Sequence, residues 1–272
     1  MISMGLSINL FGIFIALGSI MGLYVLIKEG KRKEMNIDEL YNIVIGAFIF
    51  AIIGARIYFV LAFSPQFYLE NPLQILFIHQ GGLSIQGALL GGIIFTAVYT
   101  KYKKMSFWKV ADAFAPALIV GQAIGRIGCD VFGVEMSTPR VWGVNVNGLI
   151  LHPTQIYEAL LNFALFLVLW NYRDKIKYNG QIFGLYLLGF SFNRALVELF
   201  RTNPIIIGQI TIARVTAFVF AIIAIGMLCL IRKDENTINN KKPVSPASKK
   251  RDGMIIFILM LVSTLIYYYI YL

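Results

Sequence analysis

Six arginines differ from the other basic residues of this sequence because they interrupt or border long apolar stretches. Several arginines at one depth of a membrane helix bundle need anionic partners, since each costs about 2.5–3.5 kcal/mol on insertion scales. A guanidinium donates paired hydrogen bonds to phosphate or carboxylate, which a lysine cannot do. Recognition of an anion is therefore predicted, with internal ion pairs and exposure of the charge at the membrane surface as alternatives. The six are Arg56, Arg126, Arg140, Arg194, Arg201 and Arg214.

Charged residues near the end of the apolar stretch 181–200 share one face of a predicted helix. Arg194, Glu198 and Arg201 follow the spacing i, i+4, i+7, which places them on a single stripe. Such a stripe in a membrane helix faces a cavity or the interior of the bundle, because lipid cannot solvate it. We predict that Arg126, Arg194 and Arg201 hold a bound anion and that Glu198 orients Arg194.

The longest polar interruption between two apolar stretches is the segment 125–158. It begins with Gly-Arg-Ile-Gly and ends with His-Pro-Thr-Gln-Ile-Tyr-Glu. Cys129 is a lone thiol, which is more often inert than nucleophilic. His152 precedes a proline, so a structural capping role and a role in proton transfer both remain open. The candidate substrate-binding residues here, besides Arg126, are Glu135, His152, Gln155, Tyr157 and Glu158.

A second polar candidate lies in the sequence Gly-Gly-Leu-Ser-Ile-Gln-Gly at 81–87. Gln86 is predicted to lie one turn inside a membrane helix, where its amide needs a partner. Gly87 and Gly91 predict close packing against another helix, and glycines also allow a lipid headgroup to approach the backbone. We take Gln86 as a candidate catalytic residue and Arg56, in the same half of its own helix, as a candidate substrate-binding residue.

The elements that must position these side chains are apolar helices. Of the 272 residues, 58% are apolar and 14% are charged, and the mean hydropathy is +0.73. These values indicate an all-α, polytopic transmembrane helix bundle. Two cysteines define neither a disulfide framework nor a metal site. Eight spans are predicted, at 6–27, 40–62, 82–100, 111–128, 157–171, 181–200, 210–231 and 254–271.

Loop charges predict how these spans are oriented. Most of the 24 lysines and arginines fall in four segments that share one side if all eight spans cross, and that side is then the cytoplasm. The net charge of +10 therefore indicates orientation and not nucleic-acid binding, and the N-terminus is expected outside. Gln86 and the segments 126–158 and 194–201 then meet at the extracytoplasmic end. The four basic segments are 28–39, 101–109, 172–180 and 232–253.

The motifs at 81–87, 125–128 and 152–158, with the arginine stripe, resemble the prolipoprotein diacylglyceryl transferase family over roughly residues 8–231. The resemblance implies seven core spans, so we divide the chain into a transferase-like core (1–231), a basic cytoplasmic linker (232–253) and an additional transmembrane anchor (254–272). It also implies transfer of a diacylglyceryl group from phosphatidylglycerol to the lipobox cysteine of prolipoproteins, at the outer face of the bacterial plasma membrane. The implied partners are phosphatidylglycerol, prolipoprotein signal peptides and the lipid bilayer, with no cofactor and no metal.

The sequence departs from the family pattern at Gln86, where the family usually has histidine, and at Cys129-Asp130 and Phe11. Glutamine is no general base at neutral pH, so either that histidine is not the base in the family or this chain is a diverged paralogue. We expect Arg126 and Arg194 to stabilise the phosphate as its charge grows and Gln86 to supply an orienting hydrogen bond. The alternative is a lipid-binding or transport protein that uses the same arginines without this reaction.

Overall fold

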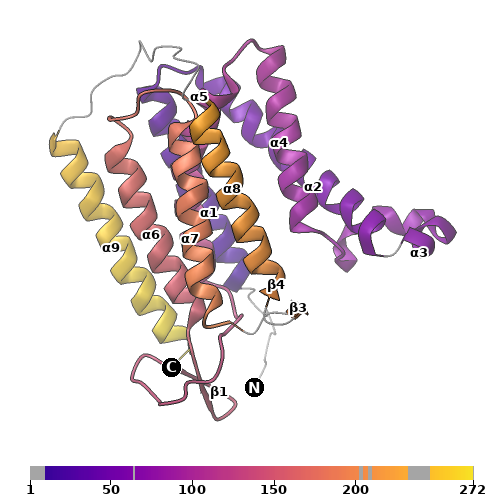
Figure 1. The fold of residues 1–272 in the computed structure, drawn as a ribbon, viewed down its shortest axis with the longest axis vertical. Helices are drawn as coiled ribbons and strands as arrows, with labels where there is room; N and C mark the ends of the chain where they lie inside the picture. The colour runs from indigo at the N-terminus through magenta and orange to yellow at the C-terminus, as the bar shows by residue number, and fades with distance from the viewer. Residues whose placement is uncertain (1–9, 64, 202–204, 208–209, 232–245, 272) are drawn as a thin grey trace, which may run out of the picture. The chain divides into compact units, whose positions relative to one another are not determined.

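The computed structural model describes residues 10–63, 65–201, 205–207, 210–231 and 246–271 of the chain, and almost all of its regular structure is helical (Figure 1). This agrees with the predicted all-α class. The helices are α1 Leu10–Arg32, α2 Ile37–Phe63, α3 Pro65–Glu70, α4 Ile85–Tyr102, α5 Phe107–Ile127, α6 Thr154–Tyr172, α7 Gln181–Glu198, α8 Ile212–Ile231 and α9 Pro246–Tyr271, with short 3-10 helices η1 Pro72–Leu76 and η2 Ile78–Gln80. The strands are β1 Val144–Val146, β2 Leu149–Leu151, β3 Ile205–Ile207 and β4 Ile210–Thr211.

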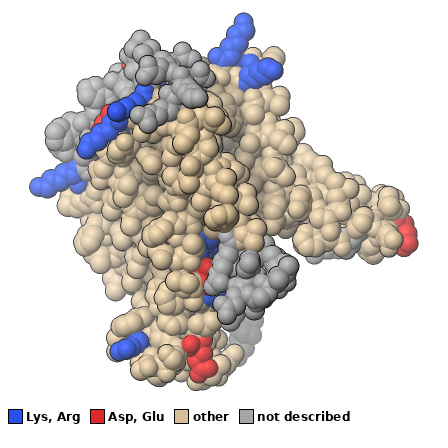
Figure 2. Space-filling model, in the orientation of Figure 1, with Lys and Arg blue, Asp and Glu red and all other residues tan. Residues whose placement is uncertain are grey.

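Each predicted span coincides with one long helix: α1, α2, or one of α4 to α9. Among the described residues, four segments are long and apolar enough to cross a membrane, namely Leu10–Arg32, Ile37–Phe63, Phe107–Ile127 and Lys250–Tyr271. Uncharged residues also cover most of the face shown in Figure 2, where lysine and arginine side chains occupy a few separate places. These features fit a membrane helical protein, while the number of crossings and their orientation remain predictions.

Four of the long helices, α2, α5, α6 and α9, begin earlier than the sequence predicted. The helix α6 begins at Thr154 after Pro153, whereas the predicted span began at 157. Proline has no N–H to leave unpaired at a helix start, so the turn before the apolar stretch is already helical. The helix α9 begins at Pro246, within the predicted linker, and residues 232–245 of that linker lie outside the described part of the chain.

The chain divides into two compact units, residues 34–110 and residues 1–33 with 111–272. In the smaller unit, α2 and α4 pack through glycines. A Cβ atom added at Gly87 would collide with the carbonyl oxygen of Gly54, and one added at Gly91 would collide with that of Phe50. Backbone atoms cannot yield as a flexible side chain would, so only glycine permits this approach. The predicted close packing at Gly87 and Gly91 is confirmed.

In the larger unit, α7 lies against α6 and α8, and α9 lies alongside α6 (Figure 1). The helix α1 approaches α5 at Gly18 and Gly121, where a Cβ atom at Gly18 would come within 2.6 Å of the Gly121 carbonyl oxygen. Phe163 and Phe166 of α6 are almost completely buried in this unit. Close packing of these helices fixes the directions in which the polar side chains at their ends point.

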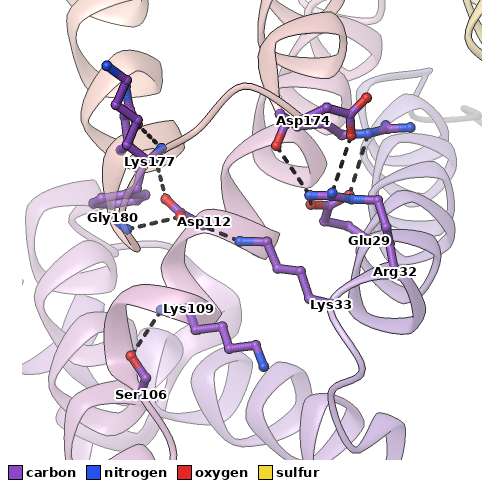
Figure 3. Close-up of polar contacts among 12 residues, drawn as sticks. Glu29, Arg32, Lys33, Ser106, Lys109, Asp112, Asp174, Lys177 and Gly180 are labelled. Carbon is purple, nitrogen blue, oxygen red and sulfur yellow. Dashed lines mark hydrogen bonds and ion pairs between the residues drawn. The ribbon is translucent and has the colours of Figure 1, made fainter. Parts of the chain in front are cut away.

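Asp112 joins three elements at one end of the larger unit (Figure 3). Its carboxylate accepts hydrogen bonds from the backbone N–H groups of Gly180 and Phe183, each at 2.9 Å, and forms an ion pair of 3.4 Å with Lys33. The first N–H groups of a helix have no partner within it. Asp112 of α5 therefore provides hydrogen-bond acceptors for N–H groups at the beginning of α7. Lys33, directly after α1, balances the negative charge of Asp112.

A second group of buried charges lies beside Asp112 in Figure 3. Arg32 pairs with Glu29 and lies 3.3 Å from Asp174, and the guanidinium of Arg173 lies 3.2 Å from the centre of the Trp170 ring. Burial lowers the pKa of Arg173 to about 10, so this side chain still carries its charge at neutral pH. The ends of α1 and α6 are held together by these pairs.

Candidate active site

Glu158 forms ion pairs with two arginines that come from different helices. Its Oε1 atom lies 2.9 Å from Arg126 Nε, and its Oε2 atom lies 3.5 Å from Arg194 Nη1. Arg126 is in the last turn of α5, Glu158 is in the second turn of α6, and Arg194 is one turn before the end of α7. The side chain of Glu158 is 3% exposed while that of Arg126 is 31% exposed, so a ligand can reach the arginine without displacing the carboxylate.

Arg201 and Glu198 complete this charged group, which we call the arginine cluster: Arg126, Glu158, Arg194, Glu198 and Arg201. Glu198 Oε2 lies 3.8 Å from Arg194 Nη2, as the i, i+4 spacing predicted. The pKa of Arg201 is lowered by burial first and then by the charges of Arg194 and Arg126, with Glu158 and Glu198 opposing the shift. Three guanidinium groups and two carboxylates leave one surplus positive charge, which matches a singly charged anion.

Two guanidinium nitrogens of the arginine cluster are buried without a hydrogen-bond partner in the described structure, Arg194 Nη1 and Arg201 Nε. The pairing of Arg194 Nη1 with Glu158 is electrostatic and lacks hydrogen-bond geometry. Buried donors are nearly always satisfied in proteins, and those that are not need an explanation such as a ligand. Donors combined with a surplus positive charge suit the oxygens of a phosphate or carboxylate.

The first three turns of α6 present a buried polar stripe. Gln155 and Glu158, at i and i+3, are 1% and 2% exposed, and Asn162 follows four residues later. The side-chain amide of Asn193 on α7 donates to Asn162 Oδ1 at 3.1 Å, which ties the two helices together next to the arginine cluster. The sequence analysis missed Asn162, although its i+4 spacing from Glu158 places it on the same face.

Hydrogen bonds join His152 and Tyr157 to the loop before α6. His152 Nδ1 lies 3.2 Å from the hydroxyl of Tyr157, and Trp142 Nε1 donates to the same hydroxyl at 3.1 Å. The His152 ring also lies 4.9 Å from that of Phe200. These surroundings favour the structural alternative for His152 over proton transfer.

The loop between α5 and α6 contains a hairpin that the sequence analysis did not predict. The strands β1 and β2 pair antiparallel around Asn147 and Gly148, whose φ angles are 54° and 87°. An Asn-Gly pair between alternating apolar residues is the strongest short-range signal for a hairpin, so this hairpin could have been predicted from the sequence. The pairing continues as Gly133 and Val134 exchange backbone hydrogen bonds with His152, which fixes the approach to α6.

Three further predicted residues of this loop lie in different surroundings. Cys129 is buried, and its Sγ atom lies 3.9 Å from Arg126 Nη1. Glu135 is exposed and forms a bridge with Leu151 through the backbone, and no ion pair among the described residues joins it to the arginine cluster. Arg140 is exposed as well. The structure thus brings together five of the predicted site residues in the arginine cluster and leaves Glu135 outside it.

In the smaller unit, Arg56 is buried and directs its guanidinium at backbone carbonyls. It donates to the oxygens of Ile75, Gly81 and Gly82 at 2.8–3.0 Å, and to that of Gln74. A guanidinium has five N–H donors, and these bonds use most of them. Arg56 therefore supports the loop between α3 and α4, and its predicted role in substrate binding stays a prediction.

Gln86 lies in the first turn of α4, where its side chain is exposed. The hydroxyl of Ser84 donates to Gln86 Oε1 at 2.5 Å. The partner that an amide in this position was expected to need is thus the serine two residues earlier. This bond fixes one end of the amide, and a role of Gln86 in catalysis stays a prediction.

Comparison with known proteins gives a consistent result. The family model for prolipoprotein diacylglyceryl transferase matches residues 1–230. A phosphatidylglycerol–prolipoprotein diacylglyceryl transferase of Clostridioides difficile (strain 630) is 36% identical over 240 residues, which cover 87% of this chain and 96% of the relative. Proteins of the same name from Bacillus cytotoxicus and Bacillus cereus (strain 03BB102) are each 35% identical over 237 residues, 82% of this chain and 87% of the relative.

The matched region contains the arginine cluster and every motif on which the resemblance was based. A family model that covers most of the chain and relatives above 30% identity both show the family, and the apolar helices fit it. The chain therefore belongs to the prolipoprotein diacylglyceryl transferase family.

Proposed function

We propose that this protein transfers a diacylglyceryl group from phosphatidylglycerol to the cysteine thiol in the lipobox of a prolipoprotein signal peptide. The observation that carries the proposal is the arginine cluster, with its surplus positive charge and with buried donors on Arg194 and Arg201 that lack a hydrogen-bond partner among the described residues. Phosphatidylglycerol has one phosphodiester and no other charge, so it matches that surplus. The transferred diacylglyceryl group and the prolipoprotein acceptor are taken from the names of the relatives.

Arg126 and Arg194 hold the phosphate in this proposal. The thiolate sulfur attacks the glyceryl carbon next to the phosphate, a C–S bond forms and the C–O bond breaks. Its electron pair leaves with glycerol phosphate, whose charge at pH 7 rises to about −1.5 to −2. Guanidinium groups placed at the leaving oxygen act where charge develops, so they lower the barrier more than they strengthen binding.

The carboxylates of the cluster set the geometry of the arginines. Glu158 holds Arg126 and Arg194 at once, and Glu198 holds the second guanidinium nitrogen of Arg194. Arg201 adds a further donor to the bound phosphate. A thiol with a pKa of ~8.5 needs only modest electrostatic stabilisation of its thiolate to ionise at neutral pH. The surplus positive charge of the cluster supplies that stabilisation. The proton is released to water.

Gln86 acts in this account through hydrogen bonding. An amide both donates and accepts, and its Oε1 atom already accepts a bond from Ser84. It therefore orients the lipid or a neighbouring loop, and no general base is required at this position. The loop before α6 is held by hydrogen bonds of His152 and Tyr157. These two residues, together with Gln155 and with Glu135 at the edge of the hairpin, form the rest of the proposed substrate-binding surface.

The site faces the outer side of the bacterial plasma membrane, with the N-terminus on the same side and the segment 232–253 in the cytoplasm. The basic residues that follow α6, Arg173, Lys175 and Lys177, support this orientation, because positively charged loops favour the cytoplasmic side. Glu158 lies near the first residue of α6 and Arg173 directly after its last, about 22 Å apart at 1.5 Å per residue. If α6 spans the bilayer, this separation allows the arginine cluster to lie near one boundary of a hydrocarbon core ~30 Å thick and the basic end of the helix near the other.

The proposal is tested with purified full-length protein in nanodiscs that contain phosphatidylglycerol. A lipobox peptide and its Cys-to-Ser analogue are added, and binding of phosphatidylglycerol is measured in parallel with modification of the peptides. Modification of the cysteine peptide alone, with phosphatidylglycerol and not with phosphatidylcholine, is expected. Tight phosphatidylglycerol binding without modified peptide would favour the alternative of a lipid-binding or transport protein.

A further inference from the structure

The last helix, α9, lies beyond the residues matched by the family model and yet contacts the loop and the helix that carry the site. Its final turns carry four tyrosines, of which Tyr267, Tyr268 and Tyr271 contact other parts of the chain while Tyr269 is exposed. The sequence analysis gave this helix no residue with a role in the site. Figure 1 shows α9 beside α6 along its length.

Both ends of α9 are held against the core, which fixes its register. At its first turns Asp252 pairs with Lys28 at 2.7 Å and accepts a hydrogen bond of 2.9 Å from Trp170 Nε1. At its last turns the hydroxyl of Tyr268 donates to the carbonyl oxygen of Trp142 at 2.9 Å. The ring of Tyr271 meets that of Phe132 edge to face at 5.3 Å. A helix fixed at two points cannot slide, so Tyr267 has a defined position.

Tyr267 reaches the polar stripe of α6. Its side chain is completely buried, and its hydroxyl donates to Gln155 Oε1 at 3.2 Å. Gln155 is 1% exposed, and its Nε2 atom has no hydrogen-bond partner in the described structure. One end of this buried amide is therefore satisfied by α9, while the other presents N–H donors that no group of the described residues accepts.

The unpaired amide nitrogen lies one helical turn from the arginine cluster. Gln155 precedes Glu158 by three residues on α6, so the two side chains share a face, and Glu158 holds Arg126 and Arg194. A buried donor beside a positively charged site is satisfied when an oxygen of the bound substrate reaches it. Without the hydroxyl of Tyr267, the amide is free to turn its oxygen toward that substrate, which would repel it.

We infer that Tyr267 is a positioning residue, which holds the Gln155 amide so that Nε2 donates to an oxygen of the bound phospholipid. This inference rests on the proposed function for the identity of the lipid. In this inference α9 contributes to substrate binding, whereas the sequence analysis predicted that this helix is an added membrane anchor.

The test compares Tyr267→Phe, which removes only the hydroxyl, with Tyr269→Phe, a matched control whose side chain is 90% exposed. Loss of one hydrogen bond is expected to lower kcat/KM for phosphatidylglycerol by about three- to tenfold, through KM, while KM for the peptide is unchanged. Tyr269→Phe is expected to match the wild type. Wild-type kinetics in Tyr267→Phe, or equal changes for both substrates that follow a lower Tm, would overturn the inference.

Two further variants separate positioning from packing. Tyr267→Phe should have no added effect in a Gln155→Ala background, because the two groups act as a unit, and additive losses would contradict this. Gln155→Glu keeps an acceptor for Tyr267 but replaces the N–H donors by an oxygen. It should weaken phosphatidylglycerol binding by more than about tenfold, as expected for an anion facing a buried like charge. Unchanged binding in Gln155→Glu would show that Nε2 does not face the lipid.

The outcome is distinguishable from failure of the proposed function. If the wild type binds phosphatidylglycerol but modifies no peptide, the transfer reaction is refuted. The equilibrium binding of phosphatidylglycerol by Tyr267→Phe, Tyr269→Phe and the wild type still tests the role of Tyr267. A threefold or larger loss of binding confined to Tyr267→Phe supports it, and equal binding by all three proteins overturns it.

Discussion

Arg126 and Glu158 form an ion pair of 2.9 Å between the last turn of α5 and the second turn of α6. The other oxygen of the same carboxylate pairs with Arg194 of α7. A buried carboxylate that holds two guanidinium groups sets their spacing before any substrate arrives. Preorganised charges of this kind need no rearrangement during the reaction, which is the usual origin of large electrostatic effects on rate.

Replacement of either arginine by lysine tests whether the planar guanidinium matters. Arg126→Lys and Arg194→Lys keep the charge but lose the paired donors, so each should lower kcat/KM by about 10- to 100-fold, the range for charge-assisted hydrogen bonds. Arg140→Lys is the matched control, because Arg140 is exposed in the loop. The measurement is steady-state transfer to a lipobox peptide. Near-normal turnover in both variants would show that these residues do not bind a phosphate through paired guanidinium hydrogen bonds.

Removal of the charge of Glu158 separates binding from turnover. Glu158→Gln leaves Arg126 and Arg194 without their shared carboxylate and raises the surplus positive charge of the cluster by one. Phosphatidylglycerol should bind at least as tightly as before, while kcat falls by about tenfold or more because the guanidinium groups lose their orientation. Glu70→Gln, at an exposed position of α3, serves as the control. A rise in KM with kcat unchanged would contradict an orienting role.

The sequence predicted the helices well because apolar stretches of about 20 residues leave few alternatives in a membrane. It also placed Arg194 and Glu198 correctly relative to each other, since their spacing is a property of one helix. The packing of Gly87 against α2 followed from the same kind of local pattern. These successes concern residues close together in the chain, whose relative positions the helix geometry determines.

Contacts between distant segments could not be predicted in the same way. Nothing in the sequence around Glu158 says that it lies between Arg126 and Arg194, because that depends on how three helices pack. The buried hydrogen bonds of Arg56 to carbonyls depend on the path of a loop. Tyr267 is 112 residues from Gln155, and an apolar final helix offers no signal of such a bond. The Asn-Gly hairpin, in contrast, was present in the sequence and was overlooked.

The substitution of Gln86 tests how this position acts. If it supplies a hydrogen bond, Gln86→Ala should lose activity, while Gln86→His should stay within about tenfold of the wild type, or ~1.4 kcal/mol of barrier. The pH dependence of kcat/KM should be similar in the wild type and Gln86→His. A rate gain well beyond tenfold with histidine, accompanied by a new dependence on pH near neutrality, would mean that a general base belongs at this position.

The orientation is tested by cysteine labelling in intact cells, in a background with Cys129→Ser and Cys229→Ser. Asn147→Cys places a thiol in the exposed turn of the hairpin and should react with an impermeant reagent. Asn240→Cys, in the predicted cytoplasmic linker, should react only after the membrane is made permeable. The opposite pattern would reverse the orientation and move the arginine cluster to the cytoplasmic side.

The central claim is that the arginine cluster binds phosphatidylglycerol for transfer of its diacylglyceryl group to a thiol. The most direct measurement is the mass of a lipobox peptide after incubation with full-length protein and phosphatidylglycerol of defined acyl chains. The account predicts a gain equal to one diacylglyceryl group on the cysteine, with release of one glycerol phosphate for each modified peptide. An unmodified peptide, or a gain equal to a single acyl chain, would contradict it.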